Sequence, residues 1–424
     1  MPEPHNNAKT SGPVFWKIAG AGAAFQAGSS TVDSATIIAS LVYQLTGSVF
    51  AVGAASAILR LGWLLPQLVV GYFAQRVPHR MPFYIFGAFG RAIFLALISL
   101  SLWLAVDMPL AVTAGAFFVL WTLYAFISGV VAVPYNDIVG RSIRSNARSR
   151  MLAWRFFGGG ILALGMAAIV HQILAGWPLL TAYAMIFALA SLLMFVSSIS
   201  FVSAGEPPTS SSSANTSGGF RDFLRDGWQI LCCETRFRLF LYTQWLGGLA
   251  MMALPFYVIA ASDLGLKPQD VAILLGAQTA GSLASNALWG RIGDGYGKLQ
   301  LLQTVGLVRL LPPVGALVLL ALDLDAGLRL AAFAALFGVI GVLINGMTIG
   351  YLGYLMEISP DDRRPAYSAY FNSLASPAAL LPIAGAAIVQ IISIQAVFIA
   401  ALLAAVIQLI LLHRMAQMEK IDAD

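Results

Sequence analysis

The chain is dominated by long apolar stretches that contain no Lys, Arg, Asp or Glu. They cover residues 110–136, 156–205, 239–262, 330–356 and 365–413. A helix needs roughly 20 apolar residues to cross a hydrocarbon core about 30 Å thick, so the second and fifth stretches are each long enough for two crossings. This pattern predicts a polytopic α-helical membrane protein.

Counting crossings of that length along the chain predicts twelve transmembrane helices. The expected ranges are 14–41, 50–74, 83–105, 110–134, 151–173, 179–201, 239–261, 269–292, 300–322, 328–356, 366–392 and 394–413. Between the sixth and seventh helices, Glu206-Pro207-Pro208 begins a stretch rich in Ser, Thr, Asn and Gly, which is typical of a flexible linker. The expected fold is an all-α membrane protein with two six-helix bundles.

These boundaries divide the chain into five expected segments. They are a cytoplasmic tail (1–13), an N-terminal six-helix bundle (14–201), a cytoplasmic linker (202–238), a C-terminal six-helix bundle (239–413) and a second cytoplasmic tail (414–424). Within the linker, residues 220–238 mix Arg and Asp with Phe, Leu and Trp, which favours an amphipathic helix at the membrane interface. The alternative is an ordered linker without a role at the lipid.

Composition and charge agree with a membrane protein and orient it. Of the 424 residues, 59% are hydrophobic and 10% are charged, whereas soluble domains carry about 25% charged residues. Most of the 24 Lys and Arg residues lie in the tails and even-numbered connections, against Lys267 and Arg329 on the other side. Because cations in short loops stay cytoplasmic, we expect both termini inside the cell, in a bacterial inner (plasma) membrane. The net charge of +5 then reflects topology and gives no basis for nucleic-acid binding.

The two predicted bundles share an internal repeat. Three pairs recur at offsets of 219 or 220 residues: Gly71 and Gly290, Asp137 and Glu357, Arg144 and Arg364. Arg91 and Arg309 recur at an offset of 218. Parallel six-helix repeats are typical of transporters that hold their solute between the two halves, near the midplane.

The connection after the eighth predicted helix reads Gly290-Arg-Ile-Gly-Asp294-Gly295-Tyr-Gly297-Lys298. It resembles the signature loop of the major facilitator superfamily, with Gly295 in place of a basic residue. The counterpart after the second helix, residues 71–80, keeps its first Gly and two Arg but has Gln75 and Pro78 where Asp and Gly are expected. With the twelve helices and the repeat, the resemblance covers nearly the whole chain.

In that superfamily such loops latch the two halves on the cytoplasmic side. The resemblance implies a cytoplasmic gate made by Gly71, Arg76, Arg80, Asp137, Arg144, Gly290, Asp294, Gly297, Lys298, Glu357 and Arg364. The alternative is that these charges only set the topology. The fifth helix carries several glycines but lacks the proline of the motif found in antiporters of the family, so the glycines by themselves indicate close helix packing.

One acid and one base lie deep in the first half. Asp33 shares a helical face with Gln26 and Ser30, and a carboxyl group at that depth is a candidate for proton coupling. The alternative is a structural Asp that pairs with a cation or lies near the outer interface. Arg60 lies about ten residues into its helix, near the midplane, where it could bind an anionic group of the solute or pair with Asp33.

The second half offers uncharged polar side chains at helical spacing. The helices that carry them commonly line the cavity in the resembling family, so the expected solute contacts are Gln244, Gln278, Ser282, Asn345 and Thr348, together with Gln26, Ser30 and Arg60 of the first half. Each could instead make an interhelical hydrogen bond. For Arg91 and Arg309, on helices that are peripheral in the family, we expect snorkelling or a fold-stabilising bond, and Arg155 lies near enough to a helix end to need no special role.

These features favour a secondary transporter that moves a small organic solute by alternating access, with protons coupled through Asp33 as one option. No nucleotide-binding loop is present, so ATP does not drive it directly. Cys232 and Cys233 are adjacent and form no disulfide or metal pattern, and no catalytic motif is found, so we expect neither an enzyme nor a bound metal or cofactor. The alternative function is a transport-inactive sensor or scaffold of the same fold.

Overall fold

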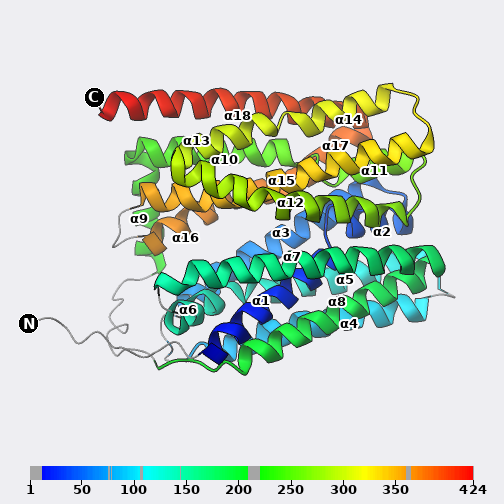
Figure 1. The fold of residues 1–424 in the computed structure, drawn as a ribbon, viewed down its shortest axis with the longest axis horizontal. Helices are drawn as coiled ribbons and strands as arrows, with labels where there is room; N and C mark the ends of the chain where they lie inside the picture. The colour runs from blue at the N-terminus through cyan, green and yellow to red at the C-terminus, as the bar shows by residue number, and fades with distance from the viewer. Residues whose placement is uncertain are drawn as a thin grey trace, which may run out of the picture.

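Helices form all the regular structure in the part of the chain that the computed structural model describes, which is residues 12–74, 77, 79–105, 108–143, 145–208, 220–359 and 364–423. The helices run side by side in two groups, with the start of α1 and the end of α18, the termini of the described chain, at the same end (Figure 1). The first group comprises α1 (Gly12–Thr31), α2 (Ile37–Thr46), α3 (Val49–Ala74), α4 (Met81–Leu104), α5 (Leu110–Gly129), α6 (Ala132–Ser142), α7 (Ser145–Gly176) and α8 (Leu179–Val202).

The second group follows the linker and its helix α9 (Phe220–Cys233). It comprises α10 (Thr235–Met251), α11 (Phe256–Asp263), α12 (Asp270–Gly295), α13 (Lys298–Val308), α14 (Leu311–Ala321), α15 (Ala326–Ile358), α16 (Arg364–Ala375), the 3-10 helix η3 (Ser376–Leu380), α17 (Leu381–Ile391) and α18 (Ile394–Ala423). Among the residues that the structure describes, eleven helical spans are long and apolar enough to cross a membrane, and α2 is a further, shorter apolar helix. The predicted fold class, a twelve-helix membrane protein, is confirmed.

The predicted single helix over 14–41 is wrong, because the chain breaks between α1 and α2. Asp33 sits in the break, where its Oδ1 accepts hydrogen bonds from the amides of Ala35 and Thr36, both at 3.0 Å. These bonds satisfy amides that begin the next helix. The corresponding helix of the second half breaks in the same way between α10 and α11, just before Phe256, where Pro255 cannot donate a helical hydrogen bond.

Small residues allow neighbouring helices to pack backbone against backbone. In the first half, a Cβ at Gly62 of α3 would lie 2.6 Å from the Ala125 carbonyl carbon of α5. In the second half, a Cβ at Gly281 of α12 would lie 2.8 Å from the Gly338 carbonyl carbon of α15. Gly62 and Gly281 are 219 residues apart, so both halves use glycine at the same step of the fold.

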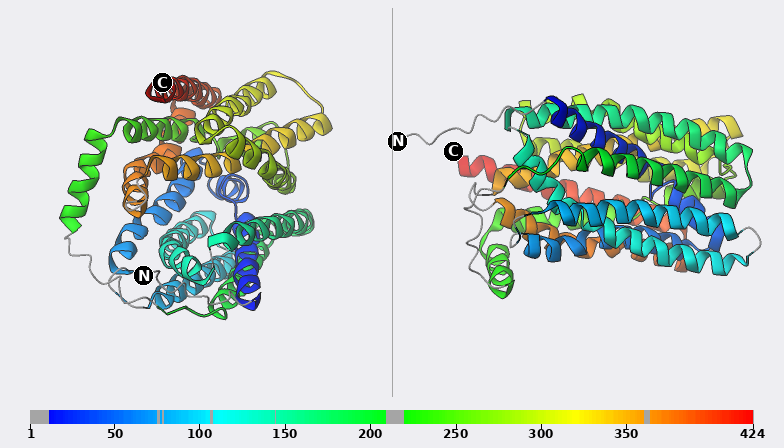
Figure 2. Two further views of the ribbon diagram at one scale, coloured as in Figure 1. Left: turned by 60° about the vertical axis from the view of Figure 1, so that its left-hand side comes forward. Right: turned by 90° about the horizontal axis from the view of Figure 1, so that it is seen from below.

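The helix α9 lies across the end of the molecule that carries the termini, roughly perpendicular to the other helices (Figure 2). Ile230 is 5% exposed, whereas Trp228 is 64% exposed. One side of α9 therefore contacts the second group, and a large aromatic side chain remains uncovered. A helix stands where the amphipathic segment was predicted, and its contact with lipid stays a prediction.

Candidate functional site

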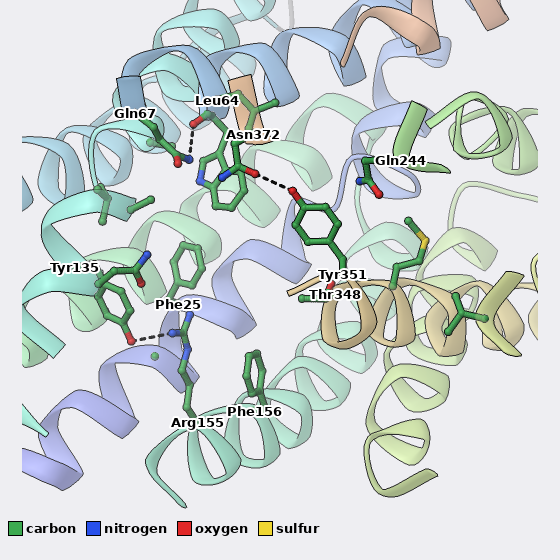
Figure 3. Close-up of a pocket in the computed structure, with 18 of the residues that line it drawn as sticks. Phe25, Leu64, Gln67, Tyr135, Arg155, Phe156, Gln244, Thr348, Tyr351 and Asn372 are labelled. Atoms are coloured by element: carbon green, nitrogen blue, oxygen red, sulfur yellow. Dashed lines mark hydrogen bonds between the residues drawn. The ribbon is translucent and has the colours of Figure 1, made fainter. Parts of the chain in front are cut away.

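A cavity of about 610 Å³ lies between the two halves. Its lining comes from α1 and α3 to α8 on one wall and from α10, α13, α15, α16 and α18 on the other. Figure 3 shows Tyr135 and Arg155 on one side of this space and Tyr351 and Gln244 on the other. The lining residues of α3, α4 and α15 lie in the portions nearest the end with the termini, so the halves stand apart there.

At the opposite end the two halves touch. The Tyr43 hydroxyl of α2 donates a hydrogen bond to Asp263 Oδ1 of α11 at 3.0 Å. His171 Nδ1 of α7 lies 2.9 Å from the Gln269 carbonyl oxygen, next to the start of α12. The cavity is therefore closed at the far end, which corresponds to an inward-facing arrangement if the termini are cytoplasmic.

Among the described residues, three arginines line the cavity, and no Asp or Glu does. Arg91 of α4 is 5% exposed, and its guanidinium carbon lies 4.4 Å from the centre of the Phe25 ring. Its Nε is buried without a hydrogen-bond partner, and no residue in the described part of the chain accepts a hydrogen bond from Arg91. A buried guanidinium normally needs an acceptor or a counterion, so Arg91 has unused capacity to bind an anion.

Arg155 of α7 lies on the same wall of the cavity. Its Nη1 donates to the Tyr135 hydroxyl at 2.7 Å, and its guanidinium carbon lies 5.1 Å from the Tyr135 ring and 5.5 Å from the Phe156 ring. A Cβ at position 22 would lie 2.5 Å from Arg155 Cγ, so Gly22 of α1 leaves the space that this side chain occupies. Its Nε is also buried without a partner.

Arg309 occupies the opposite wall, at the junction of α13 and α14. It is 5% exposed, its Nη1 donates to Gln408 Oε1, and Gln408 in turn donates to the Thr243 carbonyl oxygen at 2.8 Å. A Cβ at Gly247 would lie 2.7 Å from Nη1, so glycine is needed beside the guanidinium. The Nε of Arg309 remains buried and unpaired.

The snorkelling expected for Arg91 and Arg309 is wrong, because both side chains point into the molecule and line its cavity. For Arg309, the bond to Gln408 matches the fold-stabilising alternative. Arg155 has a place in the cavity that its position near a helix end did not suggest. The signal available in the sequence was the recurrence of Arg91 and Arg309 at equivalent depths without a recurring acid beside them.

The predicted solute contacts separate into two groups. Gln244 and Thr348 line the cavity. The others lie outside its lining: Asn345 Nδ2 donates to the Ser282 carbonyl oxygen at 3.1 Å and to Asn286 Oδ1 at 2.8 Å, which is the interhelical alternative. Ser30 Oγ donates a hydrogen bond to the Ala27 carbonyl of its own helix. Gln26 packs directly against Gly159, and Gln278 is 8% exposed.

Asp33 and Arg60 do not pair. The Asp33 carboxylate accepts hydrogen bonds from Thr36, including the hydroxyl at 2.8 Å, and it interacts with the Gln278 side chain of the second half. Arg60 has no hydrogen-bond or ion-pair partner among the described residues and lies one helical turn from Leu64, which lines the cavity. Asp33 therefore sits at a contact between the halves, and Arg60 lies just beyond the cavity wall.

Two of the charged residues expected at the cytoplasmic gate, Arg80 and Asp137, belong to a cluster within the first half. Arg80 Nη1 lies 2.6 Å from Asp137 Oδ2, and Arg141 bridges Asp137 at 2.6 Å and Glu206 at 2.7 Å. Lys298 follows Gly297, whose φ of 90° suits glycine, and Glu357 is exposed. Arg76 and Arg144 lie outside the described residues, and the side chains of Asp294 and Arg364 and the surroundings of Gly71 are likewise not described. A latch between the halves stays a prediction.

Glu206 fixes the start of the linker to the first half. Burial by itself raises the pKa of its carboxyl, but hydrogen bonds from the amides of Arg80 and Met81 and from Arg141 outweigh burial and lower the pKa below its ordinary value. Its charge therefore stabilises the fold at neutral pH.

Replacing Glu206 with Gln is expected to cost about 1.5 to 3 kcal/mol at pH 7, the usual range for hydrogen bonds to a charged group. Because the folded pKa is lowered, the contribution is complete above the pKa of the unfolded chain and is lost as the pH falls through the folded pKa. Thermal melting of purified protein between pH 7 and pH 3 tests this. Asp323→Asn, at a fully exposed acid, is the control, and equal melting of Glu206→Gln and wild type at pH 7 would contradict the prediction.

Solved structures of other proteins share this arrangement of helices, whereas no curated protein matches the chain. Among solved structures, a mutant of the nucleoside transporter NupG superposes with a TM-score of 0.69 at 13% identity, covering 96% of this chain and 99% of that one. A POT family transporter in complex with 5-aminolevulinic acid gives 0.65 at 12% identity, covering 95% and 96%. The peptide transporter POT in complex with sulfate gives 0.63 at 14% identity, covering 95% of each chain.

At such identities these structures establish the fold alone. The family model described as Major Facilitator Superfamily matches residues 18–378, which is most of the chain. This match agrees with the resemblance of the loop that follows Gly290, and it confirms the family expected from the sequence. The chain is a membrane transporter that belongs to the Major Facilitator Superfamily.

Proposed function

We propose that this chain is a secondary transporter that moves a small organic anion across the membrane by alternating access. The observation that carries the proposal is the cavity between the halves, which is lined by Arg91, Arg155 and Arg309 and by no acidic residue. Removing a guanidinium group from water without a counterion is costly. An anionic solute supplies the missing counterion at the place where the family holds its solutes.

The aromatic lining adds a second property of the solute. Phe25, Tyr135, Phe156 and Tyr351 line the same space as the arginines (Figure 3). Their ring faces offer apolar contact area, and rings stacked on a guanidinium also hold it in place for an anion. The proposed solute therefore has an apolar body as well as an acidic group.

The test is a ligand-stabilisation screen of purified protein with small organic anions, cations and neutral solutes, followed by flux in liposomes. Anions are expected to raise the melting temperature and to be transported, and Arg155→Gln should weaken their binding roughly 10- to 100-fold, because one hydrogen bond to a charged group is lost. Arg291→Gln, at an exposed arginine outside the cavity lining, is the control. Binding without flux would favour the sensor alternative, and selective transport of cations or neutral solutes would overturn the proposal.

Proton coupling is the second part of the proposal, and it rests on the position of Asp33. This carboxylate lies in the break between α1 and α2 and interacts with Gln278 of the other half. Gain or loss of its proton would change a contact that joins the halves beyond the cavity. Asp33 would then act on the conformational change and not by contacting the solute.

Asp33→Asn is expected to abolish solute-induced proton movement in liposomes while leaving solute binding within about twofold of wild type, because Asp33 does not line the cavity. A pH-sensitive dye inside the liposomes measures the movement. Asp323→Asn, at the exposed acid, should behave as wild type. Unchanged proton movement in Asp33→Asn would remove Asp33 from the coupling.

A further inference from the structure

Two of the cavity arginines form a pair across the two halves. Arg91 lies on α4 and Arg309 at the end of α13, 218 residues apart in the chain, and each is 5% exposed. In both side chains Nε is buried without a hydrogen-bond partner. Each half of the transporter thus presents one nearly buried guanidinium with donors to spare.

Neither of these two arginines pairs with a carboxylate among the described residues, and the charged group that acts on Arg91 is Arg155 of the same wall. Arg91 stacks on Phe25, and Arg309 bonds to Gln408, whose amide is held by Thr243. None of the residues that line the cavity carries a carboxylate. A guanidinium group has five N–H donors, so either arginine can donate hydrogen bonds to a carboxylate in addition to its present contacts.

Arg155 differs from this pair. It is partly exposed, and its Nη1 is already held by the Tyr135 hydroxyl. It stands on the same wall as Arg91, so the wall formed by the second half contributes a single cation, Arg309. The charge on the two walls therefore requires an anion that reaches both of them.

Alternating access adds an electrostatic requirement for the charge of the solute. When the halves close around the solute, the two walls approach each other, and like charges repel more strongly as water leaves. A solute with one acidic group neutralises one wall and leaves the other guanidinium without a counterion. A solute with an acidic group at each end supplies a counterion to a buried guanidinium on each wall, and its apolar middle contacts the rings between them.

We infer that the transported solute is a dicarboxylate-type dianion with one acidic group at each end of an apolar or aromatic body, bound by Arg91 in one half and by Arg309 in the other. This inference rests on the proposed function, because it specifies the anion that the same cavity carries. The cavity of about 610 Å³ has room for a small solute of this class. The two acidic groups, and not the total charge alone, are the feature that the cavity selects.

The experiment uses matched pairs of probes on the full-length protein: isophthalate and terephthalate, each beside its monoamide, in which one carboxylate becomes a neutral amide of nearly equal size. Binding is measured by calorimetry, and transport by counterflow in liposomes. The diacid is expected to bind at least about tenfold more tightly than its monoamide, since it makes one more charge-assisted contact. In Arg309→Gln, diacid affinity should fall to the level of the monoamide, while monoamide affinity stays within about twofold.

Arg91→Gln tests the other wall in the same way, and Arg309→Lys keeps the charge if the Gln variant fails to fold. Arg291→Gln should not alter the preference for the diacid. Equal affinity for diacid and monoamide in the wild type would overturn this inference while leaving anion transport standing, and so would tighter binding of phenyl phosphate, whose charges sit at one end, than of either diacid. Failure of every organic anion to bind would overturn the proposed function itself.

Discussion

Gly341→Leu is expected to prevent the second half of this transporter from folding. A Cβ at Gly341 of α15 would overlap the Gln278 carbonyl oxygen of α12 and would lie 2.7 Å from the Gln278 carbonyl carbon and 2.9 Å from the Ser282 amide nitrogen. These are backbone atoms, so no rotamer change can make room. In membranes, such close contacts between small residues are a main source of helix association.

The expected cost exceeds about 3 kcal/mol, the upper end of the usual range for overpacking. Size-exclusion profiles in detergent and the yield of membrane-inserted protein measure it. Gly165→Leu provides the control, because a Cβ at Gly165 meets no atom within 4 Å. A monodisperse, thermally stable Gly341→Leu protein would show that α12 and α15 do not pack as closely as described.

Cross-linking the far end of the molecule is expected to stop transport completely and reversibly. Tyr43 and Asp263 join the halves there at 3.0 Å, while the cavity separates them at the other end. If the halves rock about the central cavity, this contact must open in each cycle. In a variant that combines Tyr43→Cys with Asp263→Cys, a short bis-thiosulfonate reagent would link the two cysteines and hold this contact closed.

The experiment starts from a protein in which Cys232 and Cys233, both exposed, are replaced by Ser. Solute flux in liposomes should disappear after cross-linking of the double-Cys variant and return after reduction, whereas each single-Cys variant should keep its flux under the same treatment. Solute binding should survive the cross-link, because the cavity remains open at the end with the termini. Undiminished flux through the cross-linked protein would exclude rocking about this contact.

The sequence determined which segments enter the membrane and which family the chain joins. Apolar length is a local property, because each segment partitions into lipid largely on its own composition. The spans from 83–105 and 179–201, for example, match α4 and α8 closely. The loop that begins at Gly290 was sufficient for the family because its pattern depends on residue types at fixed spacing and not on remote contacts.

The breaks within helices were only partly open to prediction. Pro255 removes a backbone donor and accompanies the break between α10 and α11. Between α1 and α2 no proline is present, and the break depends on the hydrogen bonds that Asp33 accepts from the amides of Ala35 and Thr36. The same sequence around Asp33 is compatible with a polar stripe on one continuous helix and with a carboxylate that ends one helix and precedes another. The sequence therefore did not distinguish the two structures.

Only the tertiary structure decided which arginines line the cavity. Along a transmembrane helix, lipid and protein interior are both apolar, so the pattern of hydrophobic residues does not show which face is turned inward. Arg91 and Arg309 could reach the membrane surface or the cavity from the same sequence positions. Packing of α4 against α5 and α8, and of α13 against α15 and α18, turned them inward to opposite walls of one cavity, where neither pairs with a carboxylate of the described chain.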